Sequence, residues 1–566
     1  MKIPGSGSNS PIRIRLHIKM KKSMKQVISY ILIGLLFTAC YDDKGNYDYV
    51  DINVLEVGLD EIYSVRIASD TIVTIQPKLS QSLQENKDNL EFMWLHSTTN
   101  TNFYTIKDCD TVCRTEALKF HVDPEDAKLK YEHYFRLNVY DKLTGLEYPV
   151  NTMMKLVKPF DGAWILLHAK DGQAELGTIE YIGEEVVETK DAYYKAKGRH
   201  FRGNPLCLGR VSLSSKYYGS SSVQMFSVIT DIPEEAGVYC QWKQFEHMDS
   251  LSRMVYSADA VNFAFDKVEM IDGEGYRGGI ALANGRFYQT AAAMKLYEPA
   301  RNKDNFAGDF YISHAAKIAD VSLVYDKIGR RFGCMWHMNN SGYPDPNFFD
   351  PTKENKVELA ALPKTTSDSK DADPRNISPD QEVVYVGSGY NYNQSNASYS
   401  YAYAVATKGQ DSCFIYEFNA MGMSYGQGNP SFSNYYRLPM PKGLNESSCF
   451  ASSAAYSGII FYSAGNTIYR LDFVQQGGKA TPIYTHEGGK AVRMKFARTR
   501  SEKGLYENYE FDLARSLGVA FEMEDGTSDF VILNLAATGS LGESSEHFSA
   551  KQVYYEFGKI ADFVFL

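Results

Sequence analysis

The stretch that decides the fold is residues 459–473, IIFYSAGNTIYRLDF, in which two apolar, aromatic-rich runs flank a tight turn at Gly465. This pattern is typical of a β-hairpin, because aromatic and β-branched residues favour strands and glycine permits the turn. It recurs at intervals of 44 to 80 residues. The other six turns contain Gly172, Gly219, Gly285, Gly329, Gly409 and Gly526.

Seven such hairpins predict a β-propeller of about seven blades over residues 158–566. A four-stranded blade takes roughly 40–50 residues, so these intervals suit blades with enlarged loops. Ile560–Leu566 is a strand without a hairpin of its own. We expect it to pair with Trp164–His168 and close the ring, which removes exposed strand edges. Two stacked β-sandwiches are the alternative arrangement.

Residues 50–157 are expected to form a smaller β-domain. Between Tyr131 and Asp141 apolar side chains alternate with polar ones, as in a strand buried on one face. Short alternating strands over about 100 residues, with Trp94 on a central one, predict an Ig-like β-sandwich. His133 falls on the inward face, and we interpret it as a packed core histidine. The whole chain is therefore expected to be all-β.

The N-terminus has the features of an export signal. A lysine-rich segment precedes the apolar run Val27–Phe37, which is too short to span a bilayer because a spanning helix needs about 20 residues. Small residues then lead to Cys40. These features predict a secretory signal peptide within residues 1–39, with Met20 and Met24 as alternative starts after an upstream extension. An ordinary signal peptide with a chance cysteine is the alternative to a lipidated one.

The cysteine at this cut resembles that of the lipobox of bacterial lipoproteins, which receives diacylglycerol and becomes the mature N-terminus. The resemblance implies lipid attachment at Cys40. Residues 40–49, CYDDKGNYDY, are polar and contain glycine, so we expect a flexible tether. This stretch resembles the start of PKD-like family lipoproteins found with SusC/SusD-type nutrient-uptake systems. The resemblance implies a lipid-anchored outer-membrane location, facing the cell exterior, and a SusC/SusD-type transporter complex as partner.

Charge restricts the partners further. The chain has a formal net charge of −10, and residues 1–39 carry seven Lys and Arg but no acid, so the mature chain is more acidic still. Nucleic-acid binding requires a basic surface, so this class of partner is excluded. An electrostatic attachment to anionic lipid is disfavoured for the same reason, which leaves the lipid anchor as the link to the membrane.

Seven cysteines remain after Cys40. Cys109 and Cys113 can form a disulfide only if the three residues between them make a turn, because in an extended strand their Cα atoms would lie about 13 Å apart. The others lie in or near apolar strands and are expected to be buried thiols. No CxxC or Cys/His spacing of a zinc site occurs, and we expect no metal or cofactor.

The sequence contains no GxSxG, HExxH, P-loop or dinucleotide-binding motif, so no catalytic activity can be assigned from motifs. A ligand site is instead expected where Tyr and Asn gather without charge. Tyr offers a rigid face with a hydroxyl, and Asn both donates and accepts hydrogen bonds, which suits neutral oligosaccharides or peptides. A solvated loop is the alternative. The predicted ligand-binding residues are Tyr390, Asn391, Tyr392, Asn393, Asn396, Tyr425 and Tyr435.

These observations favour a non-catalytic surface lipoprotein that captures or handles an oligosaccharide or peptide beside a SusC/SusD-type transporter. The alternatives are a hydrolase or lyase acting on that nutrient from the propeller pocket, and a purely structural subunit. Carboxylates with raised pKa values converging in the propeller funnel would favour the enzyme, and an uncharged aromatic funnel would favour binding.

Overall fold

The structure is a computed structural model that describes most of the chain from Ile52 to Leu566. Residues 1–51, which include the expected signal peptide, Cys40 and the tether, lie outside the described residues. Within the described residues, no helix combines the length and apolarity needed to cross a membrane. The gaps are residues 68–69, 85, 100–108, 124–128, 183–184, 214–222, 256–267, 272–277, 292–297, 300, 303–307, 319–320, 337–357, 365–371, 392–399, 420–429, 475–476, 499–502, 507–508 and 546–548.

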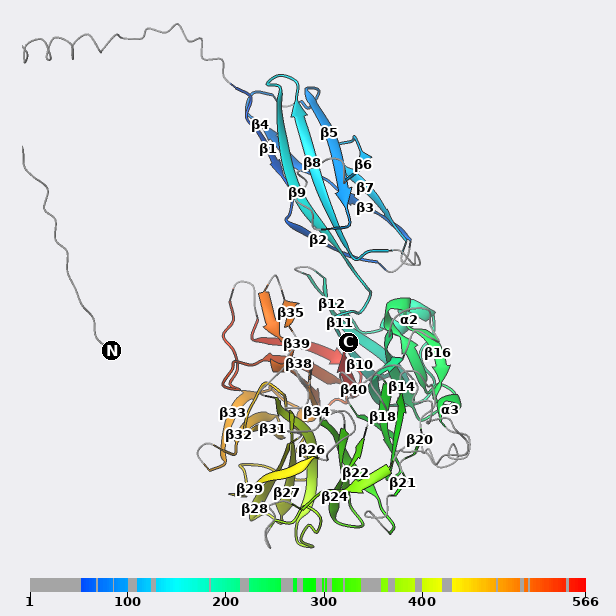
Figure 1. Ribbon diagram of the computed structural model, residues 1–566, viewed down its shortest axis with the longest axis vertical. Coiled ribbons are helices and arrows are strands. Elements are labelled where there is room, and N and C mark those ends of the chain that lie inside the picture. The colour runs from blue at the N-terminus through cyan, green and yellow to red at the C-terminus, as the bar shows by residue number, and fades with distance from the viewer. Residues whose placement is uncertain are drawn as a thin grey trace, which may run out of the picture.

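The N-terminal domain is a β-sandwich (Figure 1). One layer is a five-stranded sheet in the order β2 (Ile62–Arg66), β9 (Leu146–Val157), β8 (Glu132–Asp141), β5 (Leu90–Ser97) and β6 (Asp110–Cys113). The other layer consists of two strand pairs, β1 (Leu55–Gly58) with β4 (Lys78–Gln81) and β3 (Thr71–Ile75) with β7 (Leu118–Val122).

The sandwich core follows the predicted alternation. Trp94, Phe135 and Leu137 are completely buried between the layers. His133 is buried too, and it packs among Phe120, Phe135 and His96. The prediction of a packed core histidine is therefore confirmed.

The larger domain is a propeller of seven blades, which follow one another around a ring in Figure 1. The prediction of about seven blades is confirmed, and two stacked sandwiches are excluded. Blade 1 contains β40 (Ile560–Phe565), β10 (Ala163–Lys170), β11 (Gln173–Ile182) and β12 (Glu185–Thr189). Blade 2 contains β13 (Pro205–Leu213), β14 (Val223–Thr230), β15 (Gly237–Cys240) and β16 (Glu246–Ser250). Blade 3 contains β17 (Val268–Ile271), β18 (Gly278–Ala283), β19 (Arg286–Ala291) and β20 (Glu298–Pro299).

The remaining blades have the same plan. Blade 4 contains β22 (Ile312–Ile318), β23 (Val321–Asp326), β24 (Arg331–Trp336), β25 (Glu358–Ala361) and β21 (Arg301–Asn302). Blade 5 contains β26 (Glu382–Asn391), β27 (Ser400–Lys408), β28 (Ser412–Asn419) and β29 (Ser431–Pro439). Blade 6 contains β30 (Phe450–Ala451), β31 (Ile459–Ala464), β32 (Thr467–Asp472) and β33 (Lys479–Thr485). Blade 7 contains β34 (Lys490–Phe496), β37 (Ser516–Glu522), β38 (Ser528–Asn534) and β39 (Lys551–Phe557).

A few short elements lie outside these sheets. They are α2 (Ala192–Lys197), η2 (Gln241–Lys243), α3 (Leu251–Met254), the pair β35 (Lys503–Tyr506) and β36 (Tyr509–Asp512), and η7 (Leu513–Arg515). Each blade presents one edge strand to the centre of the ring. In order around the ring these innermost strands are β40, β13, β17, β22, β26, β30 and β34.

The C-terminal strand closes the ring as predicted. Strand β40 pairs antiparallel with β10, with Trp164 opposite Phe565 and Leu166 opposite Phe563. The last residue continues the ladder, because Leu566 N donates to Ala163 O at 2.9 Å. Blade 1 is therefore built from both ends of the propeller sequence.

The hairpin turns are in the expected places with one shift. In six blades the predicted glycine lies between the second and third strands from the centre, as at Gly465 with φ 60° between β31 and β32. In blade 2 the predicted hairpin at Gly219 instead joins the first and second strands, β13 and β14, and Gly219 itself lies outside the described residues. This shift contributes to the uneven spacing of the repeat.

Specific side chains connect the two domains. Arg66, at the end of β2, lies 3.4 Å from Glu180 of β11, and its guanidinium lies 4.6 Å from the centre of the Phe160 ring. The ammonium of Lys158 lies over the rings of Tyr131 and Trp242. Burial raises the pKa of Glu180, and the neighbouring Arg66 opposes this shift. The sandwich thus contacts the propeller beside the start of β10.

The histidine pair in the sandwich predicts acid sensitivity. His133 Nε2 lies 2.9 Å from Lys130 O, which can only accept, so His133 Nδ1 must accept from His96 Nε2. Burial lowers the pKa of His96 to about 4 and also lowers that of His133. Because the folded-state pKa values lie below the ordinary 6.5, the stability contributed by these neutral rings is complete above pH 6.5 and is lost as the pH falls towards 4.

We therefore expect the sandwich to unfold at lower urea concentration at pH 5 than at pH 7.5. Hydrogen exchange of the β5 and β8 amides, corrected for the intrinsic rate, measures this change separately from the propeller. In the His96→Phe variant the loss should be clearly smaller, because one titrating ring is removed. An equal loss in both proteins would contradict the assignment.

Candidate functional site

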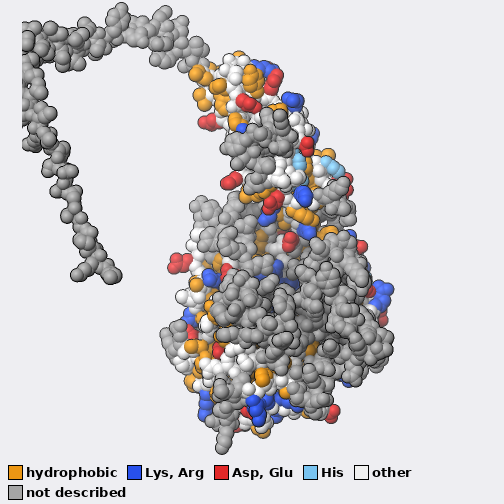
Figure 2. Space-filling view, in the orientation of Figure 1, with side chains coloured by type: hydrophobic (Ala, Val, Ile, Leu, Met, Phe, Trp, Pro, Cys, Tyr) orange, Lys and Arg blue, Asp and Glu red, His pale blue; other side chains and the backbone are white. Residues whose placement is uncertain are grey.

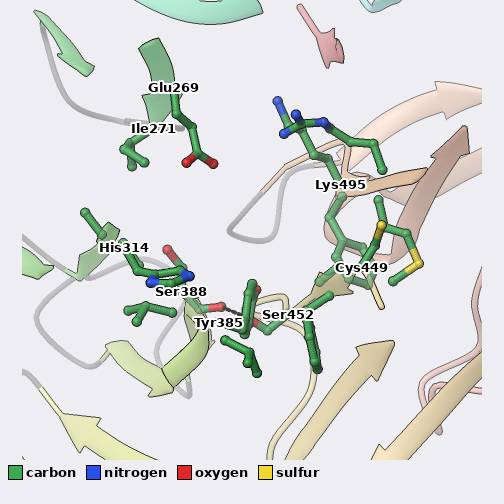
Figure 3. Close-up of a pocket in the computed structure, with 18 of the residues that line it drawn as sticks. Glu269, Ile271, His314, Tyr385, Ser388, Cys449, Ser452 and Lys495 are labelled. Carbon is green, nitrogen blue, oxygen red and sulfur yellow. Dashed lines mark hydrogen bonds between the residues drawn. The ribbon is translucent and has the colours of Figure 1, made fainter. Parts of the chain in front are cut away.

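A central channel runs along the propeller axis and contains a cavity of about 450 Å³. Its walls are the innermost strands β17, β22, β26 and β34 together with β30 and the residues before it. Figure 3 shows Glu269 and Lys495 on different sides of this cavity, with His314, Ser388 and Tyr385 along its wall. Small residues of these strands leave the space open, because the bulky apolar side chains point between the blades.

Hydroxyl groups join three innermost strands. Tyr385 and Ser452 share a hydrogen bond of 2.9 Å, Ser452 Oγ donates to Ser388 O, and Ser388 Oγ donates to Lys317 O at 2.6 Å. Burial raises the pKa of Tyr385 to about 12, so its phenol is protonated at neutral pH. These bonds tie β22, β26 and β30 together and keep the channel wall polar.

A buried carboxylate supports the wall of the channel. Asp562 of β40 is 1% exposed, and its Oδ1 lies 2.6 Å from Lys495 Nζ and 3.5 Å from Arg493 Nε. Its Oδ2 accepts from Leu208 N of β13 at 3.0 Å. Burial would raise the pKa of Asp562, but Lys495 and Arg493 outweigh it and hold the pKa below its ordinary value. The ion pairs link blades 1 and 7, and the Leu208 bond adds blade 2.

His314 of β22 also lines the channel. Burial, with a smaller contribution from the charge of Lys327, lowers the pKa of its ring to about 4. Its Nδ1 lies 3.0 Å from Ser313 Oγ. The imidazole is therefore neutral at physiological pH and offers hydrogen bonds rather than charge.

A second hollow, of about 730 Å³, adjoins the channel where the innermost strands begin. The two cavities share the lining residues Ser313, His314, Val384 and Phe450. The hollow is lined by turns of blades 4 and 5 and by the segments that lead into β26 and β30, so it opens at the ring face where these turns lie. Its polar lining residues include Lys327, Arg330, Asp380, Gln381, Gln410 and Asn445.

We call this hollow the channel mouth. Arg330 holds its wall in place by donating to the carbonyls of Ile377, Ser378 and Gln381. Tyr416 OH donates to Gln381 Oε1 at 2.6 Å, so the amide of Gln381 is fixed as well. The sandwich joins the propeller beside Phe565, where the innermost strands end. The channel mouth therefore lies at the opposite end of the channel from the sandwich.

The chemistry of the channel matches neither of the two arrangements considered from the sequence, which were an uncharged aromatic funnel for binding and converging carboxylates with raised pKa values for catalysis. The channel is charged rather than uncharged and aromatic, since Glu269, Lys317, Arg493 and Lys495 line it. The carboxylates with shifted pKa values, Asp562 in the channel and Asp380 at its mouth, are both lowered by basic partners. A general acid requires a raised pKa, so neither is suited to that role. Among the described residues, no group of three or more His, Cys, Asp or Glu side chains is placed to hold a metal.

The structure separates two of the predicted ligand-binding residues. Tyr390, at the end of β26, packs with the cluster between blades 5 and 6. Tyr435, on β29, packs against Phe414 and Tyr416 in the cluster between blades 4 and 5. The two rings thus lie on opposite faces of one blade. Asn391 ends β26, and Tyr392, Asn393, Asn396 and Tyr425 lie outside the described residues.

The cysteines are placed as follows. Asp110–Cys113 is the extended strand β6, so the turn on which a Cys109–Cys113 disulfide depends is not formed. Cys113 is a free thiol near Ala117 O. Cys207, Cys240 and Cys413 are buried free thiols, as expected from the sequence, Cys334 is buried in the cluster between blades 4 and 5, and Cys449 is half-buried.

Sequence reasoning missed the channel mouth entirely. Its residues come from three blades and lie between positions 313 and 450, and most are common surface types such as Lys327, Gln410 and Asn445. Only the repeat itself carried a usable signal, because it places turns of successive blades side by side on one face of the ring.

Comparison with known proteins gives one family match and several similar solved structures. A family model of the PKD-like family matches residues 40–205. No curated protein matches the chain. Similar solved structures include a quinoprotein alcohol dehydrogenase-like protein from Bacteroides thetaiotaomicron, with 12% identity over 89% of this chain and 96% of that one and a TM-score of 0.38. AztD from Citrobacter koseri has 8% identity over 71% and 97%, with a TM-score of 0.34.

The β-propeller domain of Cps50 (Swd1) from Myceliophteria thermophila has 8% identity over 67% of this chain and 99% of that one, with a TM-score of 0.34. Scores at this level carry no argument about function. The chain is thus similar to the PKD-like family over its N-terminal third, and its own strand order makes the remainder a propeller.

Proposed function

We propose that this protein is an outer-membrane surface lipoprotein that binds a polar nutrient, an oligosaccharide or a peptide, at the channel mouth without chemical conversion. The observation that carries the proposal is the hollow of about 730 Å³ that adjoins the channel. A hollow of this size accommodates several sugar rings or amino-acid residues, and sites of this kind are commonly concave and preformed.

The lining favours binding over catalysis. Amide, hydroxyl and charged groups surround the mouth, and Arg330 and Tyr416 fix the positions of its backbone carbonyls and of Gln381. Prearranged donors and acceptors lower the ordering cost of binding a polar ligand. The acids with shifted pKa values in the channel and its mouth are bound to lysine or arginine, which suits a structural role.

The location rests on the N-terminus. The PKD-like match begins at residue 40, the cysteine at which lipid attachment is expected. In the proposed arrangement the lipid holds the chain at the cell surface, the sandwich acts as a spacer, and the channel mouth points away from it. A SusC/SusD-type transporter complex is the proposed partner, and it would take over the bound nutrient.

The test is titration calorimetry of the unlipidated mature chain with neutral hexasaccharides and with hexapeptides. A Lys327→Ala/Gln410→Ala variant removes two exposed side chains of the mouth. We expect it to weaken binding by about tenfold, since each lost hydrogen bond to a ligand is worth about 0.5–1.5 kcal/mol.

A matched control is Lys479→Ala, which removes an exposed side chain from strand β33, away from the mouth. This variant should bind like the wild type. Equal affinity of the wild-type and mouth variants would place the site elsewhere. Chromatography of the ligand after incubation distinguishes the rival function, because shortened products would indicate a hydrolase or lyase.

A further inference from the structure

One end of the sandwich exposes an unusual set of large apolar side chains. They lie on the segment before β1, after β4 and in the β8–β9 hairpin, which is the end of the sandwich away from the propeller (Figure 1). Figure 2 shows hydrophobic side chains gathered at this end of the molecule. The set, which we call the apolar tip, consists of Ile52 (64% exposed), Val54 (57%), Leu83 (51%), Tyr140 (42%), Leu143 (57%) and Leu146 (50%).

Hydrogen bonds hold these segments together. Ser82 N donates to Val54 O and Leu83 N to Asn53 Oδ1, which joins the strand pair of the second layer. Asn53 Nδ2 donates to Asp141 Oδ2, and Asp141 Oδ1 accepts from Leu143 N.

Asp141 is completely buried, and Asn89 Nδ2 also donates to it at 2.6 Å. The apolar side chains are therefore presented by a fixed framework built around one carboxylate. Because such a surface is already held in place, it loses little conformational entropy when it binds a partner.

The chain itself indicates what covers the tip. The described structure begins at Ile52, within the apolar tip, and Cys40 precedes it by only 12 residues. A segment of that length reaches at most about 40 Å when fully extended, and a flexible one averages about 20 Å. A lipid at Cys40 would hold this end of the sandwich close to the bilayer.

We propose that the apolar tip docks onto the lipid surface and inserts its side chains into the interface beside the anchor. This inference rests on the proposed lipidation of Cys40. Partial insertion of large apolar side chains stabilises membrane contact in proportion to the apolar area buried. The neighbouring charges, Lys142 and Glu91, pair with each other at 3.2 Å. The acidic tether opposes anionic lipid, so the contact is expected to be with uncharged or zwitterionic lipid.

Docking would orient the whole protein. The sandwich would stand on the membrane with the propeller at its far end, and the channel mouth would face away from the lipid. The lipid chain would attach the protein to the membrane, and the docked apolar tip would fix the orientation of the protein.

The test is flotation of the mature chain without acyl groups on vesicles of phosphatidylcholine and phosphatidylethanolamine. We expect weak but measurable co-flotation of the wild type. The Leu143→Asp/Leu146→Asp variant should partition at least about tenfold less, because two apolar contacts are replaced by charges. Both side chains are half exposed, so thermal unfolding should be unchanged.

The matched control is Ile328→Asp/Val474→Asp, which changes two similarly exposed side chains on the propeller (61% and 52%). It should float like the wild type. Absence of wild-type flotation, or equal flotation of the tip variant, would overturn the proposal. So would dimers in light scattering that the tip variant abolishes, because a second copy would then cover the tip. Ligand titration of the tip variant should match the wild type, which separates this test from that of the proposed function.

Discussion

Removal of the last seven residues, Ile560–Leu566, is expected to prevent the propeller from folding. Five of them are apolar and almost completely buried, namely Ile560, Phe563, Val564, Phe565 and Leu566. Burial of one large apolar side chain contributes about 1.5–3 kcal/mol, so their loss removes on the order of 10 kcal/mol. Whole domains are stable by only about 5–15 kcal/mol. The loss of the ladder to β10 also exposes the edge of that strand.

The expected result is an insoluble or protease-sensitive protein whose circular dichroism shows no more strand signal than the sandwich alone provides. A control that removes residues 41–49 also shortens the mature chain, and it should fold normally. The synthetic peptide of residues 560–566, supplied in excess, should partly restore protease resistance to the truncated protein. A truncated protein as stable as the wild type would contradict the closure by β40.

Replacement of Asp562 by Asn is expected to be the most destabilising single change in the channel. It removes the carboxylate that neutralises Lys495 and Arg493, and loss of one partner of a buried ion pair costs about 3–5 kcal/mol. The two cations retain about a third of their exposure, so we expect about 3 kcal/mol, at the lower end of this range. Urea denaturation measures the change in the free energy of unfolding.

The double variant Asp562→Asn/Lys495→Met should recover part of this loss, because it removes one of the unpaired charges. Asp525→Asn is the matched control, since Asp525 lies in an exposed turn of blade 7. It should change stability by no more than about 0.5 kcal/mol. An Asp562→Asn protein as stable as this control would show that the ion pairs contribute nothing to ring closure.

The architecture was predictable because each blade repeats a local signal. The two apolar, aromatic-rich runs of residues 459–473 form β31 and β32 on either side of the turn at Gly465. Ile560–Leu566, which has no hairpin of its own, pairs with β10 and closes the ring. The register of the repeat was less predictable. In blade 2 the glycine-containing segment joins different strands, because a glycine marks a turn without identifying which turn of the blade it is.

The site could not be derived from the sequence in the same way. A cluster of Tyr and Asn was expected to line one surface, yet Tyr390 and Tyr435 pack on opposite faces of blade 5. A tyrosine fits a blade interior as well as a ligand, so its presence does not distinguish the two. The ion pair of Asp562 with Lys495 joins residues from different blades, and no local pattern reports such a contact.

Closure by the last strand also has a consequence for biogenesis. Trp164 and Phe565 face each other although about 400 residues separate them in sequence. Contacts between such distant segments form slowly, because a long loop must close first. A chain that becomes available from its N-terminus can fold the sandwich early, but its propeller remains an open arc until the final residues are available. Until then its unpaired strand edges are exposed to aggregation, for longer than the size of the domain alone would suggest.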